Sequence, residues 1–93
     1  MRALENTGQF KRDFKRESKG RHRHILPEAL KAALALLVND APLPDKYQDH
    51  PLSGDWADHR DCHIRPDLVL IYRRPNAHAL QLVRLGSHSE LGL

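Results

Sequence analysis

The chain has 93 residues and a mass of 10.7 kDa, with 40% hydrophobic and 29% charged residues. A chain of this length buries roughly 60 to 70% of the surface that its unfolded form exposes, enough for one modest core. This predicts a single domain over residues 1–93 and excludes a second domain or a large cofactor-binding architecture. The formal net charge is +3, and seven histidines, an unusual number for this length, lie outside that sum.

The charge is distributed unevenly along the chain. Residues 1–24 carry a net charge of +5, residues 25–58 one of −4, and residues 59–93 one of +2. A basic end on a chain of pI near 9.4 favours a polyanionic partner, because each Lys or Arg set against a phosphate releases a condensed counterion. Nucleic acid is the leading expectation. A membrane is disfavoured, because the longest apolar run, 32–38, is far shorter than the roughly 20 residues of a spanning helix.

The N-terminal residues and the cysteine content bear on the compartment. The first ten residues contain no apolar stretch of the kind found in a secretory signal. Cys62 is the only cysteine, so it has no partner for an internal disulfide, which fits a reducing environment. We therefore expect a cytoplasmic protein.

The first predicted elements are a short strand at 2–6 and a helix at 9–19. In this helix Phe10 and Phe14 lie one turn apart on one side and face the core. Only two residues face inward, so the helix is expected on the surface. Its basic side chains form two rows, Lys11, Lys15 and Lys19 in one and Arg12 and Arg16 in the other. These rows are as consistent with a solvated face as with a nucleic-acid contact.

A second helix is predicted at 24–40. Its buried stripe follows helical spacing and consists of Leu26, Leu30, Ala33, Leu34 and Leu37. Pro27 is tolerated only in the first turn, which puts the true start near Ile25 or Leu26. Residues 41–58 then form a long loop rich in Pro, Asp and Gly, a kind of connection that is often functional.

Three strands are predicted after the loop, at about 59–65, 68–74 and 77–85. Pro66-Asp67 and Pro75-Asn76 are typical of two-residue type I turns between them. The resulting register predicts one apolar face made of Cys62, Ile64, Val69, Ile71, Leu80 and Leu82. The opposite face carries Asp61, His63, Arg65, Tyr72 and Gln81, mixed with Leu68, Leu70 and Val83.

The expected fold is therefore α+β with the order β-α-α-β-β-β. Two N-terminal helices pack on one face of a largely antiparallel four-stranded sheet. The other face, which carries His, Asp, Arg and Tyr side chains, is expected to be a binding surface.

Four of the five histidines in the second half of the chain are candidates for chemistry, namely His50, His59, His63 and His88. Imidazole has an ordinary pKa of about 6.5, so a pair can supply a neutral base and a charged acid at neutral pH. Cleavage of RNA through its own 2′-OH needs such a pair, together with cations that hold the phosphate. Arg60, Arg65 and Arg84 are candidates for these cations, and no metal or cofactor is needed.

Other residues have simpler interpretations. We expect His22, His24 and His78 to be inert surface residues, Cys62 to be a small core residue and Trp56 to cover the core more readily than to stack on a base. Tyr72 could equally pack or contact substrate. His59 and His63 have the spacing of a helical metal site, but on a strand they lie about 13 Å apart, which is too far for one zinc ion.

Several motifs occur in a fixed order in the second half of the chain. Residues 49–56 read DHPLSGDW, residues 60–63 RDCH, residues 66–72 PDLVLIY and residues 84–88 RLGSH. With these motifs, the basic first helix and the Leu-rich second helix, the chain resembles the YafQ-type toxins of the RelE superfamily. These are bacterial mRNA interferases of type II toxin–antitoxin systems. The resemblance extends over nearly the whole chain.

The resemblance implies a ribosome-dependent endoribonuclease that cuts mRNA in the A site of the 30S subunit. It also implies a cognate antitoxin, expected to be of the ribbon-helix-helix type, and contact with operator DNA only through the toxin–antitoxin complex. By position, His50, His63, Asp67 and His88 match the family's catalytic cluster, and Arg84 matches a basic residue near the scissile phosphate.

The roles that follow from this match are hypotheses. His88 is the general acid, His50 or His63 the base, Asp67 the partner that orients an imidazole, and Arg84 the phosphate clamp. Arg60, Arg65, Lys11, Lys15 and Arg16 complete the set of expected RNA contacts.

Two positions depart from the family pattern, since Leu68 and Leu91 stand where members can carry aromatic residues. Codon preference and rate therefore do not carry over. The alternative to an enzyme is an inactive relative that keeps ribosome or antitoxin binding. A DNA-binding repressor acting alone is disfavoured, because no helix-turn-helix pattern is present.

Overall fold

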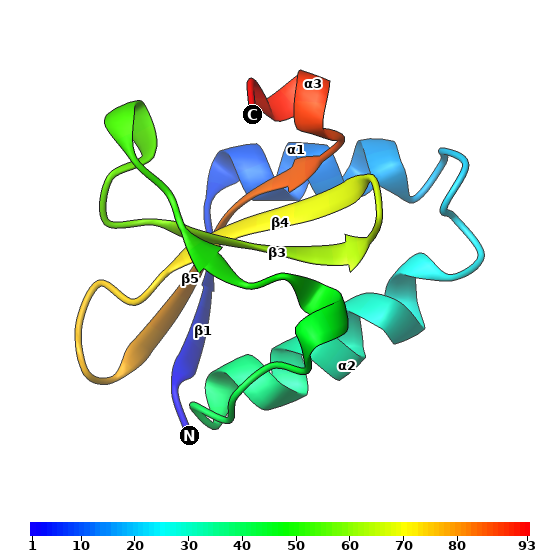
Figure 1. The fold of residues 1–93 in the computed structure, drawn as a ribbon. Coiled ribbons are helices and arrows are strands. Elements are labelled where there is room, and N and C mark those ends of the chain that lie inside the picture. The colour runs from blue at the N-terminus through cyan, green and yellow to red at the C-terminus, as the bar shows by residue number, and fades with distance from the viewer.

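A five-stranded sheet forms the centre of the computed structural model, which describes residues 1–93 (Figure 1). The strands are β1 (Ala3–Asn6), β2 (His50–Pro51), β3 (Arg60–Arg65), β4 (Leu68–Arg73) and β5 (Ala79–Gly86), in the spatial order β1-β5-β4-β3-β2. β1 runs parallel to β5, and all other neighbours are antiparallel. The α+β class is confirmed. The expected four strands become five, because β2 forms within the segment predicted as a loop.

Three α-helices and two short 3-10 turns complete the chain. They are α1 (Gly8–Glu17), α2 (Leu26–Val38), η1 (Asp45–Tyr47), η2 (Gly54–Trp56) and α3 (His88–Leu91). The hydroxyl of Thr7 caps α1 by accepting from the backbone N–H of Phe10. α2 begins at Leu26 with Pro27 in its first turn, as the sequence predicted. No helix is long and apolar enough to cross a membrane.

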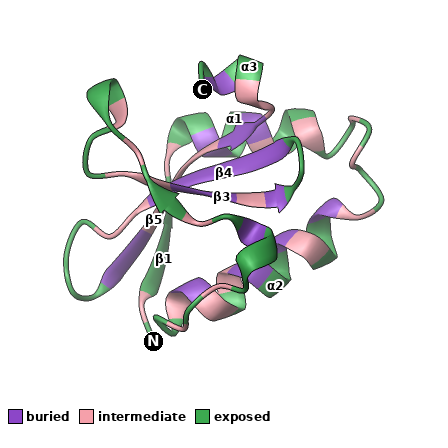
Figure 2. Cartoon of the chain, in the orientation of Figure 1, coloured by how far each residue is buried: buried purple, intermediate pink, exposed green.

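The main core lies between the two long helices and one face of the sheet (Figure 2). α1 and α2 supply Phe10, Leu26, Leu30, Ala33 and Leu37. The sheet supplies Cys62, Ile64, Leu68, Leu70, Tyr72, Leu80, Leu82 and Leu85. Both helices therefore cover the same face, as expected. Burial raises the pKa of the Cys62 thiol to about 12, consistent with its predicted role as a small core residue.

The faces of β4 are the reverse of the sequence prediction. A β-bulge lies between His63 and Arg65, so that Arg65 pairs with Leu68 whereas His63 pairs with Val69. One extra residue on one strand turns every following side chain of its partner to the other face. Leu68, Leu70 and Tyr72 consequently face the helices, while Val69 and Ile71 face away from them.

The pairing of β4 with β5 was also predicted wrongly. Arg73 pairs with Gln81, so the connection is longer than two residues, and a second irregularity lies between Ile71 and Tyr72. Val69 therefore pairs with Gly86. Tyr72, which could have been a substrate contact, is fully buried in the main core and donates its hydroxyl hydrogen to Asp49.

The second face of the sheet carries a smaller apolar cluster. Val69 and Ile71 pack there against Leu91 of α3, with Leu52 and Trp56 at the margin. Trp56 thus covers apolar residues, which was its expected role, and its ring lies edge-on to His59 at 5.4 Å between centroids. This face also carries polar side chains, among them Asp61 and His63 of β3.

Candidate active site

Three imidazoles lie in a row on the sheet face away from α1 and α2. His50 comes from β2, His63 from β3 and His88 from the start of α3. The ring centroids of His50 and His63 are 6.5 Å apart, and those of His63 and His88 are 5.0 Å apart. The structure thus brings together three histidines that lie up to 38 residues apart in the sequence.

α3 begins where it does because of a capping box. The Ser87 hydroxyl accepts from the backbone N–H of Glu90, and the Glu90 carboxylate accepts from the backbone N–H of Ser87. This S-x-x-E pattern could have predicted the helix from sequence. The cap turns the chain sharply after β5, and His88 becomes the first residue of α3.

Asp67 holds the ring of His88. Its Oδ1 lies 2.8 Å from His88 Nδ1 and accepts a second bond, of 3.2 Å, from the His88 backbone N–H. The hydrogen bond from the His88 side chain has the largest effect on the Asp67 carboxyl and lowers its pKa, and the bond from the His88 backbone N–H lowers it further. The positive charge of Arg21 lowers the same pKa as well. An ionised carboxylate can only accept, so Nδ1 carries the hydrogen and Nε2 is left for a reactant.

His50 is oriented by a backbone carbonyl. Its Nδ1 lies 2.7 Å from the carbonyl oxygen of Gln48, which can only accept, so that here too Nδ1 carries the hydrogen. Gln48 adopts left-handed backbone geometry with φ at 47°, which is uncommon for a residue other than glycine. This turn aims the carbonyl at the imidazole two residues further on.

A buried carboxylate lies beneath the row of imidazoles. Asp61 is 2% exposed, and its Oδ1 has no hydrogen-bond partner although His50 Nδ1 lies 3.0 Å away. Burial raises the pKa of Asp61, an effect that the neighbouring His50, His63 and His88 oppose. The sequence placed Asp61 on this face but gave it no role. Its cross-strand position opposite His50 was the missing signal, because β2 was not predicted.

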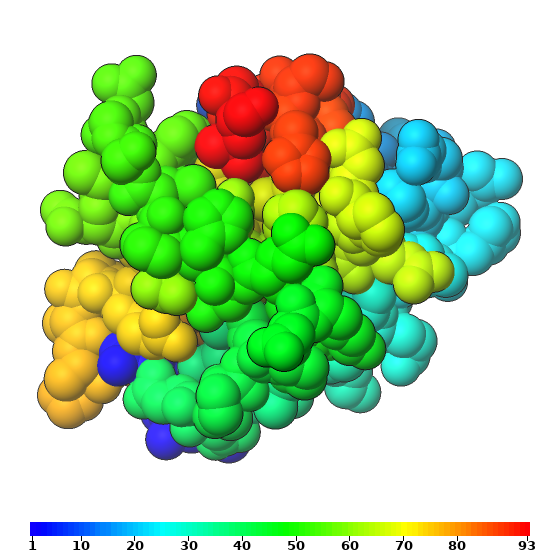
Figure 3. Space-filling view, in the orientation of Figure 1, coloured from blue at the N-terminus to red at the C-terminus, as the bar shows by residue number.

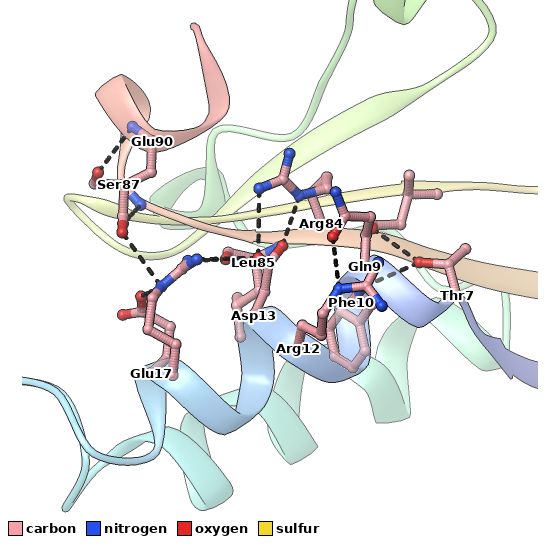
Figure 4. A network of polar contacts seen from close by, with 12 residues as sticks. Thr7, Gln9, Phe10, Arg12, Asp13, Glu17, Arg84, Leu85, Ser87 and Glu90 are labelled. Carbon is pink, nitrogen blue, oxygen red and sulfur yellow. Dashed lines mark hydrogen bonds and ion pairs between the residues drawn. The ribbon is translucent and has the colours of Figure 1, made fainter.

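Two of the expected phosphate-binding arginines are held by carboxylates of this chain. Arg84 donates from Nε to Asp13 Oδ2 at 2.7 Å and from Nη2 to Asp13 Oδ1 at 3.3 Å (Figure 4). Arg60 donates to both carboxylate oxygens of Asp49, at 3.3 and 3.2 Å. Neither forms a hydrogen bond or an ion pair with the three histidines. Arg65 is exposed at the end of β3 and has no ion pair.

The basic residues of α1 fall into two groups. Lys11 and Lys15 are exposed and form no ion pair. Arg16 lies 3.1 Å from Asp13, 3.0 Å from Glu17 and 3.2 Å from Glu90, and it also donates to the Leu85 carbonyl oxygen. Figure 4 shows this network joining α1, β5 and the start of α3. Arg16 is therefore a structural cross-link, whereas the two lysines, and Arg12, which donates only to Gln9, form no ion pair.

The remaining histidines lie outside the row. His59 points its Nδ1 to the Ala57 carbonyl oxygen, and His22, His24 and His78 have no side-chain hydrogen bond. No group of three or more His, Cys, Asp or Glu side chains is arranged to hold a metal ion. Leu68 is buried in the main core and Leu91 in the second cluster, so neither lies among the imidazoles.

Comparisons with known proteins identify the family of the chain. The family described as "Bacterial toxin of type II toxin-antitoxin system, YafQ" matches residues 2–92. The mRNA interferase toxin YafQ of Escherichia coli strain K12 is 41% identical over 92 residues, which cover 98% of this chain and 96% of that protein.

Solved structures give the same assignment. The crystal structure of YafQ from E. coli strain BL21(DE3) has a TM-score of 0.85 at 39% identity, and YafQ in the E. coli DinJ-YafQ complex has one of 0.83 at 40% identity. Each match covers 98% of both chains. The fold and the sequence thus define a class of protein, the toxins of type II toxin–antitoxin systems. Within that class, the chain belongs to the YafQ family.

Proposed function

We propose that this chain is a ribosome-dependent endoribonuclease that cuts mRNA in the A site by metal-independent attack of the 2′-OH. The observation that carries the proposal is the row of three imidazoles, two of which have Nδ1 bound so that Nε2 is left for a reactant. The name of the E. coli relative, mRNA interferase toxin, supports the reaction class.

The two outer imidazoles each have a carboxylate near Nδ1, Asp67 at 2.8 Å from His88 and Asp61 at 3.0 Å from His50. A carboxylate stabilises an imidazolium, so His88 beside Asp67 is suited to be the general acid. His50 differs in that its Nδ1 also donates to the neutral carbonyl of Gln48, at 2.7 Å, which fixes the tautomer that leaves Nε2 unprotonated in the neutral ring, and we propose His50 as the base. His63 lies between them and, when protonated, would stabilise the charge that develops on the phosphate.

The reaction balances with these groups alone. His50 Nε2 takes the 2′-OH proton, O2′ bonds to phosphorus, and the bond to the 5′-oxygen breaks as His88 Nε2 gives that oxygen a proton. The products are a 2′,3′-cyclic phosphate and a 5′-hydroxyl. Arg84 keeps its Nη1 free of hydrogen bonds within the chain, and this group is the part of the expected phosphate clamp that remains available.

The proposed partners are mRNA on the ribosome and an antitoxin. DinJ forms a complex with the E. coli YafQ protein, and by analogy a cognate antitoxin, of the ribbon-helix-helix type, neutralises this chain and brings it to operator DNA. Lys11 and Lys15 are the cations of α1 proposed to contact ribosomal RNA. The proposed site of action is the cytoplasm, where the ribosomes are.

Replacing one catalytic imidazole tests the function. His88→Ala should lower mRNA cleavage on translating ribosomes by roughly 100-fold or more, because a positioned proton donor contributes that much. His78→Ala, which removes an exposed imidazole in the β4–β5 connection, is the matched control and should cleave like the parent. Antitoxin binding should be equal in all three proteins.

The cleavage ends test the mechanism. Products with a 5′-hydroxyl are expected. A 5′-phosphate would indicate an activated water as nucleophile and would refute the 2′-OH route. Full activity of His88→Ala would instead remove His88 from the catalytic set. A parent protein that binds ribosomes and antitoxin without cleaving would be the inactive relative.

A further inference from the structure

A pocket beside His63 has no part in the catalytic mechanism proposed above. It has a volume of about 430 Å³ and lies between α2, η1 and the end of β3. This is the size range of pockets that hold small organic ligands, roughly 300 to 1,000 Å³. Figure 3 shows the face on which the green segment around η1 lies against the yellow-green end of the β3–β4 hairpin.

The walls of the hollow combine two kinds of surface. Ala29 and Ala32 of α2 form an apolar side, with the ring of Tyr47 in η1 beside them. His63 and Arg65 of β3 form the other side. A nucleobase has apolar faces and polar edges, and single-stranded RNA is recognised through both.

Three polar side chains around the hollow form no hydrogen bond or ion pair within the chain, although the Lys46 ammonium lies over the Tyr47 ring at 5.3 Å from its centroid. The amide of Gln48 makes no hydrogen bond, and neither Lys46 nor Arg65 forms an ion pair. This contrasts with Arg60 and Arg84, which are both held by carboxylates. An amide that can donate and accept at once matches the edge of a base, and two free cations match the phosphates on either side of it.

Gln48 connects the hollow to the row of imidazoles. Its backbone N–H closes η1 by donating to the Asp45 carbonyl oxygen at 3.0 Å, and its own carbonyl accepts from His50 at 2.7 Å. Its side chain lines the hollow. A left-handed residue held at both backbone ends is a fixed point, so a base bound here lies close to His50, the imidazole proposed to take the 2′-OH proton of its own or the neighbouring ribose.

We propose that this hollow binds the nucleobase of a nucleotide next to the scissile phosphate, and that Gln48 selects which base is accepted. Arg65 and Lys46 hold the adjoining phosphates. This inference rests on the proposed endoribonuclease function and assigns its codon preference to one pocket.

Two alanines of α2 give a matched pair of variants for the test. Ala32→Leu adds three carbons to the proposed base pocket, whereas Ala35→Leu makes the same change one turn further on, facing a separate apolar groove beside Phe14 and Leu34. Both alanines are exposed, so both variants should fold. Ala32→Leu should lower cleavage at the preferred codon by about 10-fold or more, the effect of losing one well-held base. Ala35→Leu should cleave like the parent.

A third variant tests the selecting residue. Gln48→Asn keeps a side chain that tolerates positive φ but shortens its reach. Mapping all cuts on one translated message should show that the ranking of codons changes, while the total number of cuts changes less. An unchanged ranking would exclude Gln48 as the selecting residue.

A binding measurement separates this inference from the proposed function. Nucleoside 3′-monophosphates titrated into the ¹⁵N-labelled parent should shift the amide resonances of Tyr47, Gln48 and Ile64. The shifts should be lost in Ala32→Leu and kept in Ala35→Leu. Equal shifts in both variants, or none in the parent, would overturn the pocket assignment. Shifts in a parent that cleaves no message would uphold the pocket and refute the endoribonuclease.

Discussion

Two aspartates of this chain are buried to the same degree but differ in how their carboxylates are hydrogen-bonded. Asp13 in α1 and Asp61 in β3 are each 2% exposed. Asp13 accepts hydrogen bonds from Arg84, Arg16 and the backbone N–H of Leu85 (Figure 4). Asp61 has an oxygen with no hydrogen-bond partner.

The two carboxyls accordingly differ in the direction of their pKa shifts. For Asp13, burial raises the pKa, but the bonds from Arg84 and Leu85 and the charges of Arg84 and Arg16 together lower it further than burial raises it. For Asp61, burial prevails and the pKa is raised. Buried carboxylates are normally paired, so an unpaired one calls for a reason. Asp13 joins α1 to β5, whereas Asp61 supplies negative charge beneath three imidazoles.

The largest change in the free energy of unfolding is expected at Asp13, whose carboxylate is fully paired. Asp13→Ala leaves Arg84 without its ion-pair partner and the buried N–H of Leu85 without an acceptor. Breaking a buried charge network in this way destabilises a protein by about 3 to 5 kcal/mol. Urea denaturation followed by circular dichroism measures the change. Asp55→Ala, at an exposed residue of η2 with no ion pair, is the control. A loss below about 1 kcal/mol for Asp13→Ala would mean that solvent replaces the network.

At Asp61 we expect a substitution to raise the free energy of unfolding and not to lower it. Asp61→Asn removes a buried charge with no hydrogen-bond partner on one oxygen and keeps the shape of the side chain, so the free energy of unfolding at neutral pH should rise by roughly 1 kcal/mol. Cleavage should fall by about 10-fold, because the imidazolium forms lose a stabilising charge. Thermal unfolding and mRNA cleavage on the same preparation measure both. A variant that is less stable yet fully active would refute the assigned role.

Titration sharpens this comparison. The pKa of Asp61 is raised in the folded protein, so the wild-type carboxyl gains its proton first as pH falls, and the advantage of Asp61→Asn should shrink on acidification through that pKa. The pKa of Asp13 is lowered, so its stabilising effect is fully present above the unfolded value and is lost only as pH falls through the folded one. Unfolding curves between neutral and acidic pH should therefore converge first for Asp61→Asn and later for Asp13→Asn. The reverse order would contradict both assignments.

The contrast also explains what could be predicted from the sequence. His50, His63, Asp67 and His88 were named from the resemblance to the YafQ-type family, and the structure brings them together, with Asp67 bound to His88. The pairing of Asp13 with Arg84 joins residues 71 apart, and no local pattern encodes it. The helix positions followed from periodicity, with the stripe of α2 correct from Leu26 to Leu37.

The sheet was harder to predict than the helices. Four of its five strands were located within two residues and β2 was missed, and the faces of β4 depend on one bulged residue between His63 and Arg65. Type I turn residues at Pro66-Asp67 are compatible with either register, so the sequence had no means of choosing. The register of β3 against β4 decides whether Tyr72 faces substrate or core. For this reason the sequence alone left the role of Tyr72 open. Packing of Leu68, Leu70 and Tyr72 against the helices settles it.

The smallest effect on stability is expected at the two unpaired lysines of α1. Lys11→Glu combined with Lys15→Glu changes exposed residues without ion pairs, so the free energy of unfolding should stay within about 0.5 kcal/mol of the parent. Arg16 is left unchanged, because its contacts with Asp13 and Glu90 would confound the result. Ribosome association should weaken strongly at low salt and little at high salt, since opposite charges are screened beyond roughly 10 Å at 0.1 M salt. Equal affinities of parent and double variant for the ribosome at low salt would show that Lys11 and Lys15 lie on a solvated face of α1. The cations that bind RNA would then be those around the imidazoles.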